Sequence, residues 1–197
     1  MLGHWWGVHL AMHLAVAQPD RVAGLVLVDG LGAVGDDGIA EMGQAMVDRL
    51  LPGALARMQE MAGQMARREP ADADATEQTA LQWPGYFAEP AAAPPWPPQM
   101  RVSLAACAGT VASVAGHLAA GFAGSPGAIS VPVAFVLGAQ SPLPVSQGQQ
   151  TAALIPSAEV TVIPAAGHLP WIEQPGCVAD ALASVRALAG DLETPAG

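Results

Sequence analysis

The chain has 197 residues, of which 52% are hydrophobic and 12% charged, a composition typical of a globular protein with a sizeable core. Its formal net charge is -10 at pH 7 and its seven Lys and Arg residues form no cluster, so we expect no nucleic-acid partner. The two cysteines, Cys107 and Cys177, lack metal-ligand spacing and fit a reducing compartment. Residues 1–18 are apolar but carry no basic segment, so they predict neither a signal peptide nor a membrane span, and we expect a cytoplasmic protein without membrane contact.

The first 32 residues predict a turn, a helix and a buried strand. Gly3 to Gly7 form a Gly-rich turn, and residues 8–18 then place apolar side chains at helical spacing until Pro19 ends the pattern. Residues 21–29 follow as a nearly continuous aliphatic run. Such a run is typical of a strand buried on both faces of a parallel sheet.

Residues 33–125 differ from what precedes and follows them. Ala- and Met-rich stretches predict helices at 39–51 and 54–67, and a further helix is expected at 102–118. Between them, residues 89–98 are a Pro-rich loop that can be neither a helix nor a central strand. We interpret residues 33–125 as a helical cap inserted into a core formed by residues 1–32 and 126–197.

Strands and helices alternate again in the last part of the chain. The pattern predicts strands at 131–137 and 160–163 and helices at 149–154 and 177–188. This alternation favours an α/β fold with a mostly parallel sheet.

Three segments in this order resemble the α/β-hydrolase family, particularly its proline-iminopeptidase-like and esterase-like members. GHWWG occupies the place of the family's G-x-S-x-G turn, and RVAGLVLVDGLG resembles the strand after the next helix. PVAFVLGAQSP and VTVIPAAGHLPWIEQP resemble the last two strands. The resemblance implies a partial α/β-hydrolase fold, containing the last three strands of the sheet and a helical cap.

The family's mechanism assigns a role to each matching position. A serine on the turn attacks a carbonyl, a histidine takes its proton, an acid orients the histidine, and backbone N–H groups stabilise the oxyanion. By resemblance, His168 is the base and Trp6 supplies an oxyanion N–H, while Trp5 stands at the nucleophile position. An indole cannot form an acyl ester, and a bulky side chain strains such a turn.

The acid is less directly indicated. After the penultimate strand, where the family often carries it, this chain has Ser141, which cannot hold an imidazolium as a carboxylate does. Some members place the acid one strand earlier, and Asp29 ends that strand, so Asp29 is our candidate, with a plain strand-end cap as the alternative. Asp36 and Asp37 are weaker candidates that fit solvated loop charges, and Glu173 is expected to be structural.

Other residues allow two interpretations each. His9 and His13 lie one helical turn apart and could ligate a metal, although partner-bonded or surface histidines are favoured. Cys107 could replace the nucleophile only if the cap folded over the histidine, and a buried apolar cysteine is the default expectation. The aromatic group of Trp83, Tyr86 and Trp96 could line a pocket for a small-molecule substrate or ligand, or simply pack.

We therefore expect a hydrolase of ester, amide or peptide bonds by ancestry, using no cofactor or metal, whose activity is impaired. Trp5 replaces the nucleophile, and the resemblance begins at the nucleophile turn, which leaves strand 22–28 as an open edge. Three explanations stay open: an incomplete gene model or a pseudogene product, a second polypeptide that supplies the first half, or a homo-oligomer formed through the edge. The alternative function is a non-catalytic ligand-binding or interaction module.

Overall fold

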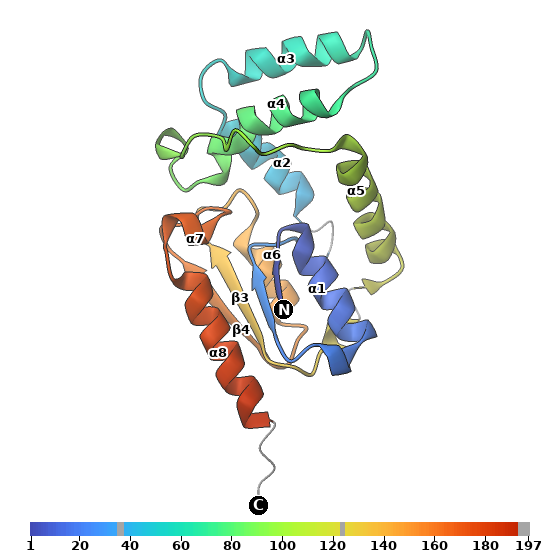
Figure 1. The fold of residues 1–197 in the computed structure, drawn as a ribbon, viewed down its shortest axis with the longest axis vertical. Helices are drawn as coiled ribbons and strands as arrows, with labels where there is room; N and C mark the ends of the chain where they lie inside the picture. Colours follow the sequence, from blue (N-terminus) through green and yellow to red (C-terminus); the bar gives the residue numbers. More distant parts are fainter. Residues whose placement is uncertain (35–37, 123–124, 193–197) are drawn as a thin grey trace, which may run out of the picture.

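A parallel sheet forms the centre of the protein in a computed structural model that describes residues 1–34, 38–122 and 125–192 (Figure 1). Its four strands lie in the order β1 (Leu2–His4), β2 (Leu25–Val28), β3 (Val133–Gly138) and β4 (Ala158–Ile163). In the register, Leu2 pairs with Val26, Leu25 with Val133, and Val133 with Ala158. The α/β class and the parallel sheet expected from the sequence are confirmed.

Helices cover both faces of the sheet. Helices α1 (Trp6–Ala17) and α6 (Val145–Ala152) pack on one face, and α8 (Cys177–Leu192) packs on the other (Figure 1). Successive side chains of a strand point to opposite faces, so Leu25 and Leu27 join the α1 cluster while Val26 and Val28 lie in the α8 cluster. All residues of β2 and β3 are buried. This confirms the expectation that the aliphatic run at 21–29 contains a strand covered on both faces of the sheet.

The open edge differs from the expectation. We expected strand 22–28 to be the edge, and this is wrong, because β1 pairs with β2 along its outer side. The carbonyl of Met1 accepts a hydrogen bond from the Val26 backbone N–H at 2.9 Å, so the first four residues suffice for a short strand. In the described sheet the edges are therefore β1 and β4.

Four α-helices lie between β2 and β3 in sequence: α2 (Ile39–Asp48), α3 (Ala54–Met65), α4 (Asp72–Gln82) and α5 (Leu104–Ala119). Figure 1 places α2, α3 and α4 beyond the end of the sheet toward which the strands point. The division into core and cap nevertheless stays a prediction. Among the described residues, short 3-10 turns lie at η1 (Pro19–Arg21), η2 (Trp83–Tyr86), η3 (Pro90–Ala92) and η5 (Pro126–Ala128).

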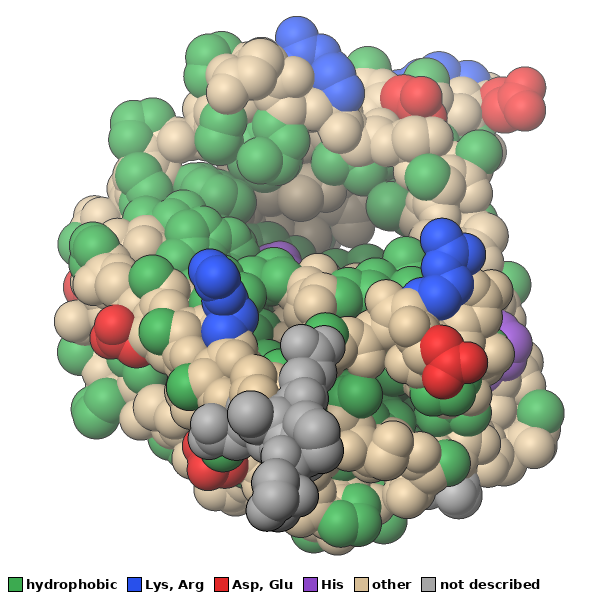
Figure 2. Space-filling model, turned by 60° about the horizontal axis from the view of Figure 1, so that its bottom comes forward, with side chains coloured by type: hydrophobic (Ala, Val, Ile, Leu, Met, Phe, Trp, Pro, Cys, Tyr) green, Lys and Arg blue, Asp and Glu red, His purple; other side chains and the backbone are tan. Residues whose placement is uncertain are grey.

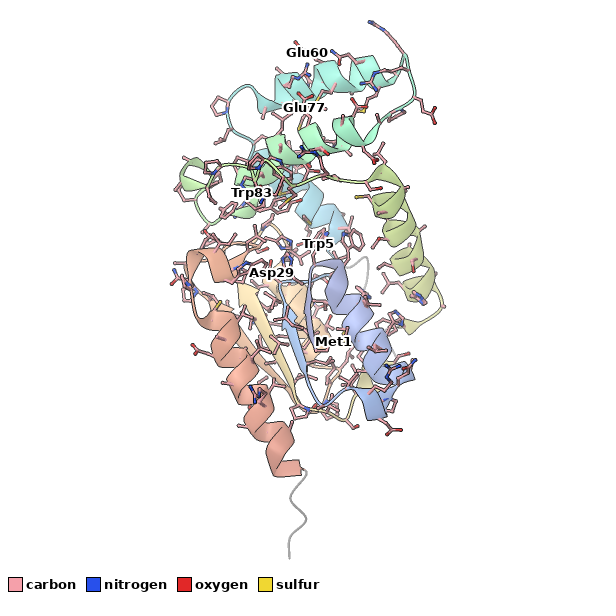
Figure 3. All side chains as sticks on the ribbon, in the orientation of Figure 1. Met1, Trp5, Asp29, Glu60, Glu77 and Trp83 are labelled. Atoms are coloured by element: carbon pink, nitrogen blue, oxygen red, sulfur yellow. The ribbon has the colours of Figure 1, made fainter. Side chains whose placement is uncertain are left out.

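Helices α3 and α4 are joined by an ion pair, in which Arg57 Nε donates to Glu77 Oε1 at 2.7 Å. Figure 3 shows Glu77 and Glu60 on these two helices, far from the sheet. On the face drawn in Figure 2 charged side chains are sparse, and hydrophobic side chains border a hollow. Within the described residues, no helix combines the length and the apolarity that a bilayer crossing requires.

Candidate active site

The turn between β1 and α1 forces one residue into an unusual backbone conformation. Trp5 has φ 56°, which lies in the left-handed region that residues other than glycine rarely adopt. A Cβ atom at Gly3 would lie 2.2 Å from the Gly7 carbonyl oxygen, so only glycine fits at position 3. A Cβ atom at Gly7 would meet no described atom within 4 Å. The tight turn inferred from the motif is present, but only one of its two glycines is required for space.

Asp29 follows β2 directly and is 2% exposed. Its Oδ2 atom accepts hydrogen bonds from His168 Nδ1 at 2.7 Å and from Ser141 Oγ at 2.6 Å. Its Oδ1 atom accepts one from the Gly138 backbone N–H, at the end of β3, at 2.9 Å. Asp29 is thus both the carboxylate beside the histidine and a hydrogen-bond acceptor at the strand end, while its role as the catalytic acid stays a prediction.

His168 lies in the loop between β4 and α7 (Pro170–Glu173), and its backbone is fixed from two sides. Its N–H donates to the Tyr86 carbonyl at 2.7 Å, and a Cβ atom at the preceding Gly167 would lie 2.2 Å from the same oxygen. Glu173 accepts from the backbone N–H groups of Gly167 at 2.6 Å and Ala88 at 2.8 Å. The structural role expected for Glu173 is therefore to join the histidine loop to the segment after η2.

The Trp5 indole lies next to the imidazole of His168. The two ring centroids are 4.8 Å apart and the rings meet at 85°, edge to face. Figure 3 shows Trp5 and Asp29 at the same end of the sheet, below the helices that follow β2. The structure thus brings residue 5, His168 and Asp29 together, as the resemblance implies. Trp6 is the first residue of α1.

A carboxylate can only accept hydrogen bonds, so Nδ1 of His168 is the donor toward Asp29. This arrangement leaves Nε2 with the lone pair of the neutral ring, as general base chemistry requires. The geometry therefore pairs an imidazole with a buried carboxylate that can orient it. The side chain at position 5, however, offers no atom that could attack a carbonyl.

Two polar residues of the site were not assigned from the sequence. His4 donates from Nε2 to the His168 carbonyl at 3.0 Å, and burial, reinforced by His168, lowers its pKa to about 4. Ser141 was rejected as an acid, and it instead donates a hydrogen bond to the acid. Its position after the penultimate strand was the available signal, because β2 and β3 are adjacent parallel strands and the residues that follow them meet at one edge of the sheet.

The remaining candidates lie outside this constellation. His9 Nε2 bonds to the Gly32 carbonyl at 2.8 Å, which confirms the partner-bonded interpretation. No group of three metal-ligating side chains occurs among the described residues. Cys107 is exposed on α5, so the default expectation of a buried cysteine is wrong, because α5 packs loosely there. Asp36 and Asp37 lie outside the described residues.

The three aromatic residues of the middle region divide between packing and the site. Trp83 meets Trp96 edge to face at 5.5 Å and belongs to a cluster with Phe87. Tyr86 also contacts this cluster, but its ring lies 5.2 Å from that of His168. Packing accounts for Trp83 and Trp96, whereas Tyr86 forms a wall of the candidate site.

Comparisons with known proteins point to one fold. No protein-family model matches the sequence. The lipase LipV of Mycobacterium tuberculosis (strain ATCC 25618 / H37Rv) is 41% identical over 78 residues, which are 38% of this chain and 30% of that protein.

Solved structures match over nearly the whole chain. The proline iminopeptidase of Mycobacterium smegmatis has a TM-score of 0.61 at 17% identity, over 98% of this chain and 66% of that one. VinJ has a TM-score of 0.61 at 16% identity, over 95% of this chain and 65% of that one. Est816, described as an N-acyl homoserine lactone degrading enzyme, has a TM-score of 0.52 at 21% identity, over 93% of this chain and 65% of that one. The chain therefore spans 65% of VinJ and 30% of LipV.

Proposed function

We propose that this chain, which has the α/β-hydrolase fold, keeps the acid–base pair of a serine-type hydrolase and lacks its nucleophile. The reaction of its ancestors would be hydrolysis of an ester, amide or peptide bond through an acyl-enzyme. One observation carries the proposal: His168 Nδ1 lies 2.7 Å from Asp29 Oδ2 while an indole fills the adjoining place of the nucleophile. The expected result is little or no serine-type turnover by the chain itself.

Each retained part has a role in the proposed ancestral reaction. Nε2 of His168 would take the proton of an attacking hydroxyl, and Asp29 would hold the imidazole in the correct tautomer and stabilise its charged form. The backbone N–H of Trp6 would face the oxyanion, because the first N–H groups of a helix have no partner within it and the helix dipole favours negative charge there.

Replacement of the nucleophile removes the covalent step, and it also removes space. Loss of the nucleophile from a serine triad has cost roughly a millionfold in turnover in one protease. In this chain the indole edge, packed against the imidazole, occupies the volume that an acyl group would need.

The direct test is to restore the missing group with Trp5→Ser and to use Trp5→Ala as the matched control. A serine at position 5 supplies an attacking hydroxyl, whereas alanine only opens the space. We expect a fluorophosphonate probe to label Trp5→Ser alone, and the labelling to disappear when His168→Ala is added.

Two outcomes would contradict the proposal. One is robust hydrolysis of a p-nitrophenyl ester by the natural chain that disappears in His168→Ala. The other is a Trp5→Ser protein with unchanged circular dichroism that the probe leaves unlabelled, because the acid–base pair would then be unable to activate a nucleophile.

A second candidate function, ligand binding without turnover, is favoured by the packing around Trp5. Trp5, Trp6 and Tyr86 form an aromatic wall against the buried cluster of Leu31, Met42, Met46 and Leu143. N-acyl homoserine lactones, which Est816 is described as degrading, are the first compounds to screen. Stabilisation against heat by such a compound, without probe labelling, would favour binding over catalysis.

A further inference from the structure

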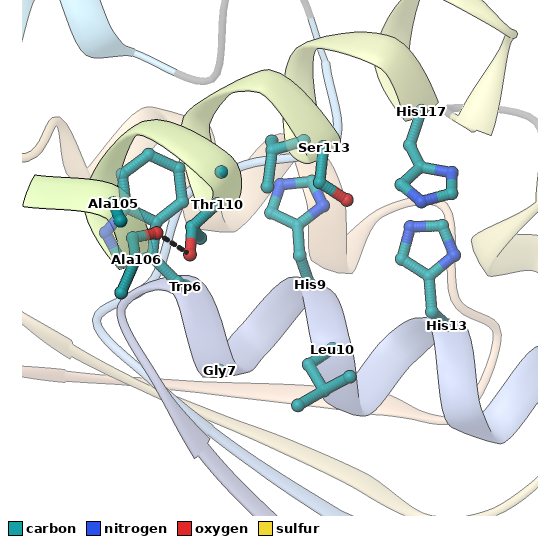
Figure 4. Close-up of a pocket in the computed structure, with 12 residues that line it drawn as sticks. Trp6, Gly7, His9, Leu10, His13, Ala105, Ala106, Thr110, Ser113 and His117 are labelled. Atoms are coloured by element: carbon teal, nitrogen blue, oxygen red, sulfur yellow. Dashed lines mark hydrogen bonds between the residues drawn. The ribbon is translucent and has the colours of Figure 1, made fainter.

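A cavity lies between α1 and α5. Its volume is about 680 Å³, which lies within the range of small-molecule sites. Trp6 and Leu10 of α1 and Ala106 and Val114 of α5 contribute its apolar lining (Figure 4). Trp6 is shared with the candidate active site, but Trp5, Asp29 and His168 do not line the cavity, so it does not include the acid–base pair.

The two ends of this cavity differ in chemistry. Figure 4 shows Trp6 at one end, while His13 and His117 face each other from the two helices at the other end. The ring centroids of these histidines are 4.1 Å apart. His13 follows Trp6 by seven positions along α1, which corresponds to roughly 10 Å along the helix axis. The cavity is therefore elongated, apolar at one end and lined by imidazoles at the other.

One of these imidazoles has an unsatisfied polar atom. Nε2 of His13 is buried and has no hydrogen-bond partner among the described residues. A buried polar atom without a partner is costly, so a ligand atom that pairs with it would gain the hydrogen bond and relieve this cost. The lining contains no Asp, Glu, Lys or Arg, and His9 is its one other titratable residue.

Helix α5 itself leaves the space unfilled. Its sequence, LAACAGTVASVAGHLA, is mostly apolar, yet Val114 is its one buried residue. An apolar helix gains stability mainly by burying its face against other groups. A ligand with an apolar body would supply that burial between α5 and α1.

We propose that this cavity binds an alkyl monocarboxylate, with the alkyl chain along Trp6 and Leu10 and the carboxylate at the end where His13 and His117 meet. The carboxylate accepts a hydrogen bond from each imidazole, and such bonds strengthen when the donor is charged. The site goes beyond the proposed function, because it needs neither the acid–base pair nor a nucleophile.

The same geometry makes binding depend on pH. Burial and the neighbouring His117 lower the pKa of His13, and burial likewise lowers that of His9. A bound carboxylate favours the charged imidazole, so binding takes up protons and becomes tighter as the pH falls. No carboxylate of the lining competes for this charge.

Calorimetric titration of the full chain with decanoate, below its micellar concentration and with EDTA present, tests the proposal. We expect decanoate to bind at least tenfold more tightly than decanol, which lacks the charge, or acetate, which lacks the chain. Affinity should rise at least threefold from pH 7.5 to pH 6.0. His117→Ala, a substitution on an exposed helix surface, should weaken decanoate binding at least fivefold and leave decanol binding unchanged.

A pair of glycine substitutions on α5 distinguishes the cavity from other surfaces. Gly109 lines the cavity and Gly116 does not, and a Cβ atom at either would meet no described atom within 4 Å. Leucine is a better helix former than glycine, so both variants should fold. Gly109→Leu should abolish binding and Gly116→Leu should leave it intact. Absence of decanoate binding, equal affinity for decanol, or equal effects of the two leucines would each overturn the proposal.

Discussion

Asp29 shows how one carboxylate can serve structure and chemistry together. It accepts hydrogen bonds from the end of β3, from Ser141 and from His168. A buried carboxylate is costly unless such donors surround it, and three donors compensate for its removal from water. Loss of any activity on substitution of Asp29 would therefore mix catalysis with folding, whereas position 5 can be changed without removing a buried charge.

The lowered pKa of His4 predicts that the protein becomes less stable in acid. Burial lowers its pKa from 6.5 to about 4, so between these values the unfolded chain binds a proton that the folded chain does not. The contribution of a neutral His4 to the free energy of unfolding is fully present above about pH 6.5. It is lost as the pH drops toward about 4, and the loss from this group is at most about 3 kcal/mol. His4→Gln keeps a donor for the His168 carbonyl but does not titrate.

Urea unfolding at pH 7.0 and pH 5.0 measures this effect. The urea midpoint of the natural chain should be lower at pH 5.0 than at pH 7.0, and this decrease should be smaller in His4→Gln. It should not vanish, because burial also lowers the pKa of His9 and His13. An equal fall in both proteins would show that His4 is not the group responsible.

At the scale of elements, the turn from β1 to α1 makes a prediction that separates two similar glycines. Gly3→Ala places a Cβ atom 2.2 Å from the Gly7 carbonyl, so the turn must shift and we expect a loss of about 2 kcal/mol in unfolding free energy. Gly7→Ala meets no described atom within 4 Å and lies in α1, so it should be neutral or stabilise by up to about 1 kcal/mol. Chemical denaturation of the two variants measures both, and equal losses would contradict the close approach at Gly3.

Elements with a clear hydrophobic pattern could be predicted from the sequence. Elements that depend on contacts with distant parts of the chain could not. The aliphatic run of β2 identified a buried strand and placed Asp29 at its end. β1 has three residues, too few for any periodicity, so its pairing with β2 was missed. α4 was missed because its sequence, DADATEQTALQ, is polar and shows no apolar stripe. Its start is fixed by Asp74, which accepts from the Ala71 N–H at 2.7 Å.

The same division holds for the candidate site. The motif GHWWG and the loop before α7 identified Trp5 and His168, because each carries a local signature. The hydrogen bonds of Ser141 and His4 join residues more than a hundred positions apart and depend on the assembled sheet. The cavity between α1 and α5 has no local signature either, since it is formed by two helices that are distant in sequence.

At the scale of the whole molecule, the two sheet edges differ in their protection against pairing. β4 carries Glu159 on an exposed stretch, and charge on an edge strand discourages pairing with another chain. β1 carries no acidic or basic residue except His4, which is directed to the His168 loop, and its Leu2 is 45% exposed. We therefore expect the 197-residue chain to self-associate through β1.

Sedimentation velocity across the micromolar range tests this expectation with one substitution on each edge. The natural chain should associate as its concentration rises. Leu2→Lys places a charge on β1, and this variant should stay monomeric at higher concentrations than the natural chain. Val160→Lys places the same charge on β4, where Val160 is 39% exposed, and should leave the association unchanged. A natural chain that stays monomeric would refute pairing through either edge, and an effect confined to Val160→Lys would assign the interface to β4. Because both substitutions add one positive charge to a chain of net charge -10, a difference between them cannot arise from net charge and must reflect the edge on which each one lies.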